Sequence, residues 1–354
     1  MTFPWLPASA TGIGSLPGTD IAAAIRSVFD EVPDLPYLPE LPNRGPGADM
    51  IGRAAGLLVA MPVELYAGRW RIASHSGIDA RRTRDLWDRD LDALTDHADT
   101  YDGLLKVQVA GPWTLAASLE RPIRGRMLGD AGAVRDLAES LAEGVAQHVA
   151  AVSARLPHAR VLVQVDEPSL PAVLAGEIPT ESGFSRLRAV AADTVRDSLR
   201  IVISAAGVPV IVHCCAPRPP LDLMRQAGAA GVAIDLDQVT DLDPLGEVLE
   251  AGVGLFAGVN AGGGRSGSGA AVSSNRSGRV GAAGRVAAGV VAEKPSVVVA
   301  DRVRDLWRTI GFPADGLTAQ VVVTPACGLA GFGQEAAVTA MRIAREASRR
   351  LADG

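Results

Sequence analysis

The chain has 354 residues, of which 48% are hydrophobic and 21% charged, and it carries a formal net charge of −6. This composition is typical of a globular protein, and the net negative charge argues against a nucleic-acid partner, which would need a basic surface. The sequence lacks any run of about 18 apolar residues, and its first residues lack the basic start and apolar core of a signal peptide. We therefore expect no membrane partner and a location in the cytoplasm.

Short apolar runs alternate with helical periodicity along the chain. A first strand is expected at 9–15 and a second at 33–41, where prolines interrupt the pattern. The clearer strands are apolar runs rich in β-branched residues, at 105–112, 160–168, 209–215, 231–237, 254–260 and 320–328. Apolar residues recurring with the helical period predict helices at 18–31, 84–101, 132–155, 183–205, 219–228, 243–251, 296–311 and 334–352.

This alternation predicts an α/β protein, for which an open doubly wound sheet and a closed barrel are the two main architectures. About eight strand–helix repeats over this length favour a single (β/α)8 barrel, the TIM barrel. The glycine motif at 12–18 lacks the G-x-G-x-x-G spacing of a dinucleotide-binding sheet. We therefore predict one barrel domain over residues 1–354.

The segment 261–285 departs from the pattern because it is rich in Gly and Ser and has no apolar periodicity. Such a composition buries too little surface to offset the entropy of ordering. We predict a flexible insertion after the seventh strand. A mobile lid is the alternative, because this end of a barrel carries the active site.

Residues that carry chemistry gather at the expected C-terminal ends of the strands. All three cysteines and one of the five histidines lie there; the residues at these ends are Gly14, Ser15, Gly111, Pro112, Asp166, Glu167, His213, Cys214, Cys215, Asp235, Asp237, Asn260 and Cys327. An odd number of cysteines in a cytoplasmic chain indicates metal binding or nucleophilic chemistry rather than a disulfide framework. The other histidines lie away from strand ends and are expected to be structural.

His213 and Cys215 lie two residues apart on one strand, so their side chains point to the same side and Cys214 points away into packing. Zinc prefers nitrogen and sulfur ligands in a tetrahedron. With Cys327 they predict a zinc site, and Asp235 or Asp237 on an intervening strand is the candidate fourth ligand. An exchangeable position on the metal would take a substrate thiol as a thiolate. The alternative is that the cysteines are small apolar filling.

Two further strand ends carry polar groups with more than one interpretation. Asp166 and Glu167, followed by Pro168, would cap a helix, bind a substrate ammonium or exchange a proton. Ser15 would cap the next helix or hold a carboxylate on nearby backbone N–H groups.

Five motifs then occur in a specific order: GIGSLPGT (12–19), AGPWTL (110–115), QVDEPSL (164–170), VHCC (212–215) and PACGL (325–329). In these motifs the chain resembles the catalytic C-terminal half of cobalamin-independent methionine synthase and its shorter single-barrel relatives in archaea and actinobacteria. The likeness covers nearly the whole chain outside 261–295. The wider superfamily, which includes uroporphyrinogen decarboxylase, shares the barrel.

The resemblance implies a reaction in which zinc holds homocysteine as a thiolate, which attacks a methyl group carried on 5-methyltetrahydrofolate or on a protein-bound donor. Catalytic roles are implied for Asp166 and Glu167, with Asp166 taking the amino group of homocysteine. Backbone groups of Ile13, Gly14 and Ser15 are implied to hold this substrate. The positions that match the zinc ligands are His213, Cys215, Cys327 and, as the fourth, Asp235 in preference to Asp237.

Three departures concern other parts of the family site. Asn260 stands where the family has a proton-donating histidine, and Ser118 lies near the place of a folate-stacking tryptophan. Gly52 falls on a glutamate that contacts homocysteine. The thiol-activating end therefore resembles the family more closely than the folate end, and the methyl donor is expected to differ from free folate. Another zinc-dependent alkyl-thiol transferase, or a non-catalytic binding member of the family, are the alternative functions.

Overall fold

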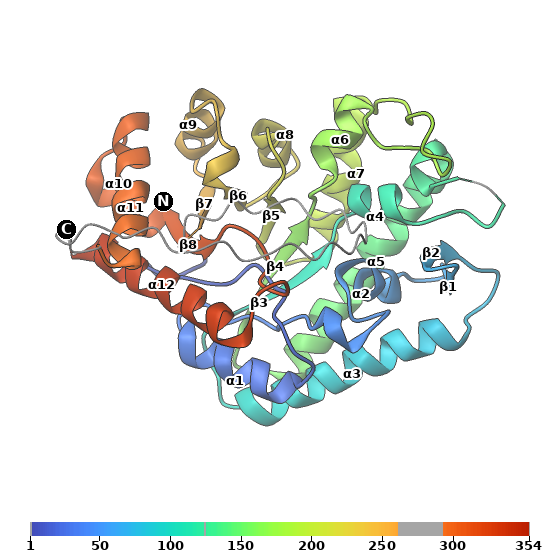
Figure 1. Ribbon diagram of the computed structural model, residues 1–354, viewed down its shortest axis with the longest axis horizontal. Helices are drawn as coiled ribbons and strands as arrows, with labels where there is room; N and C mark the ends of the chain where they lie inside the picture. Colours follow the sequence, from blue (N-terminus) through green and yellow to red (C-terminus); the bar gives the residue numbers. More distant parts are fainter. Residues whose placement is uncertain (1, 124, 261–292, 354) are drawn as a thin grey trace, which may run out of the picture.

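A six-stranded parallel sheet forms the centre of the protein (Figure 1). The computed structural model describes residues 2–123, 125–260 and 293–353, so the predicted insertion at 261–285 lies outside the described residues. The strands stand side by side in sequence order: β3 (Leu104–Ala110), β4 (Arg160–Asp166), β5 (Val210–Cys214), β6 (Gly231–Asp235), β7 (Gly254–Val259) and β8 (Val321–Pro325). These are the six clearer strands predicted from the sequence.

Each strand of this sheet is followed by one or more helices, and the helices surround the sheet (Figure 1). They are α1 (Ile21–Glu31), α2 (Met50–Leu57), α3 (Ile78–Ala98), α4 (Pro112–Ser118), α5 (Ala131–Arg155), α6 (Leu170–Ala175), α7 (Ala192–Ala205), α8 (Leu221–Gln226), α9 (Asp243–Glu250), α10 (Pro295–Ile310), α11 (Ala314–Gln320) and α12 (Gln334–Ala352). Each helix predicted from periodicity is present, but the one expected over 183–205 begins only at Ala192. Within the described part of the chain, none has the length and apolar character needed to cross a membrane.

The two edges of the sheet are linked through the N-terminal part of the chain. Single parallel bridges join Ala10 to Val323 in β8, Ser15 to Glu40, and Tyr37 to Lys106 in β3. The strands expected at 9–15 and 33–41 thus pair at isolated positions only. Proline lacks an amide donor, and prolines at 33, 36, 39 and 42 prevent a continuous ladder in the second segment.

Side chains of the six strands alternate between two environments. One set packs against the helices in the main apolar core; it includes Val107, Val163, Val212, Val232, Leu255 and Val323. The other set begins, near the strand starts, as a small apolar layer of Leu104, Leu162, Ile211, Ala233, Phe256 and Val322. Toward the strand ends this second set becomes polar but stays buried, with Lys106, Gln108, Gln164, Asp166, His213 and Thr324. These buried polar side chains mark the ends of the strands as the place of the candidate site.

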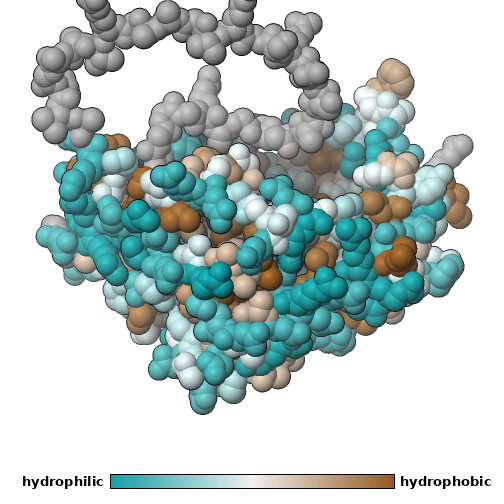
Figure 2. All heavy atoms as spheres, turned by 60° about the horizontal axis from the view of Figure 1, so that its bottom comes forward, coloured by the Kyte–Doolittle hydropathy of each residue, from teal (hydrophilic) through white to brown (hydrophobic). Residues whose placement is uncertain are grey.

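The opposite, outer side of the helical layer is polar. Figure 2 shows that the face on which α1 and α3 lie is covered mainly by hydrophilic side chains, with scattered hydrophobic ones. Such a surface is normal for a helical layer whose apolar stripe faces a sheet.

Several short elements were not expected from the sequence. Helices α2, α4, α6 and α11 have eight residues or fewer, too short for apolar periodicity to show clearly. A hairpin, β1 (Val63–Tyr66) and β2 (Arg69–Ile72), turns through Ala67 and Gly68, both with positive φ. Two positive φ values match the type I′ turn, which favours glycine at one of its central positions.

Candidate active site

Two cysteine side chains meet beyond the ends of the strands. Cys215 follows β5 and Cys327 follows β8, and their Sγ atoms lie 3.6 Å apart. Strands β6 and β7 stand between β5 and β8 in the sheet, so residues far apart in the sequence converge at one place. Contact with Cys215 lowers the pKa of Cys327 to about 6, and the same contact raises the pKa of Cys215. The pair therefore favours a state with one thiol and one thiolate.

His213 lies on the same strand as Cys215 and is nearly fully buried. Its Nδ1 lies 2.7 Å from Oδ1 of Asp166, while its Nε2 is buried with no hydrogen-bond partner among the described residues. A histidine held at one nitrogen by a carboxylate is oriented to offer the other nitrogen to a ligand. Cys214, as expected, faces the opposite way and packs in the main core.

These groups partly fit a zinc ion. Two thiolates at tetrahedral zinc, each about 2.3 Å from the metal, lie about 3.8 Å apart, close to the 3.6 Å between the two sulfur atoms. The unpaired Nε2 of His213 supplies a nitrogen of the right type. Within the described residues, however, three or more His, Cys, Asp or Glu side chains nowhere form an assembled metal-binding group. The arrangement is a thiol pair with a neighbouring free imidazole nitrogen, not a complete coordination shell.

The two candidate aspartates after β6 differ in their surroundings. Asp235 is buried, and its Oδ1 accepts a hydrogen bond from the amide of Asp237. Asp237 is bound at the surface by Arg302, at 2.5 Å, and by the side-chain amide of Asn260, at 3.0 Å. The carboxylate of Asp237 is thus already occupied, and Asp235 remains the better candidate for a fourth ligand.

The backbone from Ile13 to Ser15 presents unpaired donors. All three carbonyl oxygens accept hydrogen bonds: Ile13 from Lys106 and Gln164, Gly14 from the Glu40 amide, and Ser15 from the Leu329 amide. The amide N–H groups of Gly14 and Ser15 have no acceptor among the described residues. Successive free N–H groups form a site for an anion such as a carboxylate. The Leu329 contact also ties this segment to the turn that carries Cys327.

Glycine at position 14 is required by a close approach. A Cβ atom there would lie 2.9 Å from Cγ of Gln108. The side chain of Gln108 donates to the carbonyl of Leu38, at 2.6 Å, and leaves its own Oε1 buried without a donor. Gln108 thus packs against Gly14 and carries a buried, unpaired acceptor into the same interior.

Two buried carboxylates face the same interior. Asp166 accepts hydrogen bonds at Oδ1 from Gln164 and His213, both at 2.7 Å, and its Oδ2 has no hydrogen bond among the described residues. Glu40 lies on the neighbouring N-terminal segment and is 4% exposed. Burial raises the pKa of Glu40 to about 7, and the Asp166 charge nearby adds to that effect. A pair of buried carboxylates is suited to binding a cationic group.

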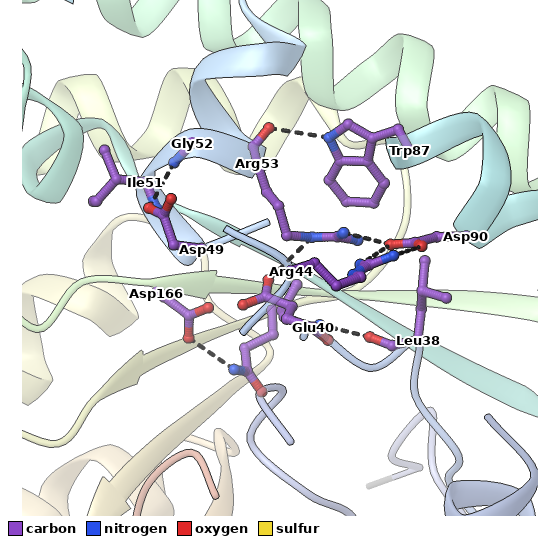
Figure 3. Close-up of polar contacts among 12 residues, drawn as sticks. Leu38, Glu40, Arg44, Asp49, Ile51, Gly52, Arg53, Trp87, Asp90 and Asp166 are labelled. Carbon is purple, nitrogen blue, oxygen red and sulfur yellow. Dashed lines mark hydrogen bonds and ion pairs between the residues drawn. The ribbon is translucent and has the colours of Figure 1, made fainter. Parts of the chain in front are cut away.

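Glu40 is supported by an ionic network that extends outward (Figure 3). Its Oε1 lies 3.8 Å from Nε of Arg53, which also pairs with Asp90 at 2.5 Å. Asp90 in turn holds Arg44 through two hydrogen bonds, of 2.5 and 2.8 Å. The Arg53 guanidinium lies over the ring of Trp87, 3.8 Å from its centre. The network joins α2 and α3 to the segment that carries Glu40.

Glu167 has a structural role in this structure. Its Oε1 accepts from the Trp113 amide, and its Oε2 accepts from the amide and hydroxyl of Thr114, at 2.7–2.9 Å. The side chain is fully buried. It therefore caps the N-terminus of α4, which lies earlier in the chain and is not the helix that follows Pro168, and both oxygens are occupied.

Three further positions were compared with the family: Ser118, near the place of the folate-stacking tryptophan, Trp113, nearer the turn, and Gly52, which falls on the glutamate that contacts homocysteine. Trp113 is fully buried and donates from its indole to the carbonyl of Val195, so its ring faces no ligand. Ser118 lines an open cavity of about 500 Å³ together with residues that include Trp70, Arg69 and Arg126. Gly52 lies in α2, where a Cβ would meet the backbone of Gly47.

Sequence reasoning missed four polar residues of the interior: Glu40, Lys106, Gln108 and Gln164. A signal for three of them is present in the sequence, because LKVQV (105–109) and LVQVD (162–166) alternate apolar and polar residues in strands expected to be buried on both faces. Glu40 lies in the segment expected as a strand at 33–41, but the prolines of that segment interrupt the alternation that would have marked Glu40 as buried.

Comparisons with known proteins give a fold and no family. No protein-family model and no curated protein matches the sequence. Among solved structures, the chain resembles a B12-independent methionine synthase from Shewanella sp. W3-18-1 in complex with selenomethionine, with a TM-score of 0.53, 10% identity and coverage of 100% of this chain and 98% of that one. A putative dihydrodipicolinate synthetase from Pseudomonas aeruginosa has a TM-score of 0.35 at 12% identity, over 71% of this chain and 64% of that one. The first likeness shows a related fold; the second is too weak to carry an argument.

Proposed function

We propose that this chain is a zinc-dependent methyltransferase that moves a methyl group to the thiol of homocysteine and forms methionine. The observation that carries the proposal is the pair of sulfur atoms, Cys215 and Cys327, 3.6 Å apart beside the buried His213. Unpaired amides and buried carboxylates of the same interior supply the groups that an amino-acid substrate needs.

The proposed fold is a complete (β/α)8 barrel. The six regular strands would be closed by the segments around 10–15 and 37–40, which already bridge β8 to β3 at single positions. Closure places the ends of all eight strands around one mouth. This explains why β5 and β8, separated by two strands on one side, present sulfur atoms in contact.

Zinc would be held by His213, Cys215 and Cys327, with Asp235 as the fourth ligand. When bound, it would keep the sulfur of homocysteine deprotonated and nucleophilic near neutral pH. Asp166 would hold Nδ1 of His213 and so present Nε2 to the metal. The S–CH3 bond would form as the bond between the methyl group and its donor breaks, with the electron pair left on the donor; a folate nitrogen would take up a proton, whereas a corrinoid would leave as cobalt(I) without one.

The amino-acid part of the substrate would be bound by this chain's own groups. The free amides of Gly14 and Ser15 would hold its carboxylate. The free Oδ2 of Asp166, the carboxylate of Glu40 and the unpaired Oε1 of Gln108 would surround its ammonium. Selenomethionine in the methionine synthase structure from Shewanella is an amino acid of this shape, which supports the proposal.

Methionine synthesis with purified protein tests this function. Homocysteine, zinc and a methyl donor should yield methionine, and the yield should fall after chelation of the metal and return when zinc is added back. The donors to compare are 5-methyltetrahydrofolate and a corrinoid-protein-bound methyl. Methionine binding without turnover from any donor would instead support a non-catalytic binding protein, a reading favoured by the lack of an assembled three-ligand group in the described residues. Turnover with other thiols only would support a different alkyl-thiol transferase.

A further inference from the structure

A lysine stands at the centre of the polar interior. Lys106 of β3 is fully buried. Its Nζ lies 3.0 Å from the carbonyl oxygen of Ile13 and 2.8 Å from Oε1 of Gln164. Burying an amine is costly unless its hydrogen bonds are made, so its position needs a reason beyond filling space, which a methionine would do as well.

Gln164 completes a small ring with this lysine. Its Nε2 donates to the same Ile13 carbonyl and to Oδ1 of Asp166, each at 2.7 Å. Asp166 in turn contacts His213. A continuous path of hydrogen bonds therefore runs from the Ile13 carbonyl to the imidazole beside the thiol pair.

Because the peptide bond is rigid, the hydrogen bonds to the Ile13 carbonyl also affect the N–H group of Gly14. The Ile13–Gly14 peptide is planar and trans, so the Ile13 carbonyl and the Gly14 N–H point in opposite directions. Two donors on the carbonyl fix the plane of the peptide and polarise it, which strengthens the Gly14 N–H as a donor. That N–H is one of the two unpaired amides described above.

We infer that Lys106 is a positioning residue, which with Gln164 holds the Ile13–Gly14 peptide so that the Gly14 amide binds the carboxylate of the amino-acid substrate. The inference rests on the proposed function for the identity of that substrate. Only two N–H bonds from Nζ are required, and both the ammonium and the neutral amine supply them.

Selective isotope labelling isolates the amide in question. With ¹³C-carbonyl isoleucine and ¹⁵N-glycine, only Ile–Gly peptides give HNCO signals, and the sequence has three: 13–14, 51–52 and 310–311. The amides of Gly52 and Gly311 are already bonded, to Asp49 and to the Arg308 carbonyl, so they act as internal references. Ile51→Val and Ile310→Val assign the reference signals by removing them.

Methionine should move the Gly14 amide proton downfield and leave both references in place. In Lys106→Met the Gly14 signal of the free protein should move upfield, because its peptide is less polarised. Methionine affinity, measured by calorimetry, should fall by about 10-fold or more. At pH 8.5, where the lowered pKa of Lys106, about 7, leaves its amine neutral, the affinity for 3-(methylthio)propylamine, which lacks the carboxylate, should stay within about 2-fold, since that ligand makes no use of the Gly14 amide.

Each other outcome counts against the inference in a distinct way. A Gly14 signal unchanged by Lys106→Met, or equal loss of affinity for both ligands, would show a merely structural lysine. Should this variant fail to fold, Gln164→Leu removes the other donor to the same carbonyl and should give the same upfield shift of the Gly14 signal. Wild-type protein that binds neither methionine nor homocysteine would overturn the proposed function and this inference together.

Discussion

The three cysteine residues differ in solvent exposure: Cys214 is buried, Cys215 is half-buried and Cys327 is exposed. Cys327→Ser replaces a soft thiolate by a weak ligand and should lower zinc affinity on the order of 100-fold, at least as much as loss of an outer-shell partner. Cys214→Ala is the matched control, because that side chain faces the core, and it should retain zinc. Metal content after dialysis against a competing chelator measures both; equal zinc in Cys327→Ser and wild type would remove Cys327 from the site.

The carboxyl group of Glu40 should make amino-acid binding depend on pH. Burial raises its pKa to about 7, so at lower pH the free protein holds it neutral and attracts an ammonium less. Methionine affinity should therefore rise with pH up to about 7 and then level off. Lys106, whose pKa burial lowers to about 7, loses its charge in the same range and acts in the same direction.

The variant Glu40→Gln separates the two groups. It should weaken binding and make the plot of log affinity against pH shallower, because one of the titrating groups is gone. Calorimetry from pH 5.5 to 8.5 measures the slope for both proteins. Identical slopes would mean that Glu40 does not meet the substrate ammonium.

At the scale of elements, Asp90 ties α2 and the 42–44 turn to α3. It is fully buried and pairs with both Arg44 and Arg53. Removing one partner of a buried ion pair leaves uncompensated charge, so Asp90→Ala should lower the free energy of unfolding by about 3–5 kcal/mol. Asp92→Ala is the control two residues along the same helix; that side chain is 71% exposed and 3.7 Å from Arg155, and its loss should cost about 1 kcal/mol or less.

Urea denaturation of the two variants measures the difference. Because Arg53 lies beside Glu40, Asp90→Ala should also weaken methionine binding, whereas Asp92→Ala should not. Similar stability of the two variants would contradict the view that this network supports the site.

The elements that periodicity predicted bury regular apolar stripes, whereas those it missed depend on contacts with distant parts of the chain. Strands such as β5 and helices such as α5 bury long regular stripes, and those stripes are visible in sequence. The segment 33–41 pairs at one or two residues, and α4 depends on a distant cap, Glu167, for its N-terminus. Support of that kind comes from the tertiary structure and leaves no local pattern.

At the scale of the whole molecule, the sequence predicted that the candidate residues lie at strand ends but not which of their atoms come into contact. The side chains of His213 and Cys215 point to the same side because the two residues lie two positions apart on a strand. The contact between Cys215 and Cys327 instead depends on how β5 and β8 are brought together. The pairing of Lys106 with the Ile13 carbonyl likewise joins residues 93 positions apart. Only the folded chain shows such contacts.

The proposed site departs most from the family that the sequence resembles at the end that would hold the methyl donor. A methyl on a tertiary amine leaves only if the nitrogen is protonated and held in line. Asn260 is bound to Asp237, and Trp113 is buried against Val195, so neither serves folate as a donor histidine or a stacking surface would. Monoglutamyl 5-methyltetrahydrofolate should therefore be a poorer donor than a protein-bound methyl at equal concentration, measured as methionine formed; efficient turnover with the free folate would contradict this.

Zinc X-ray absorption, recorded on the purified protein with and without homocysteine, tests the central claim most directly. We expect one zinc per chain with two sulfur ligands and one imidazole, and a third sulfur ligand when homocysteine is added. A protein that binds no zinc, or whose zinc spectrum is unchanged by homocysteine, would contradict it.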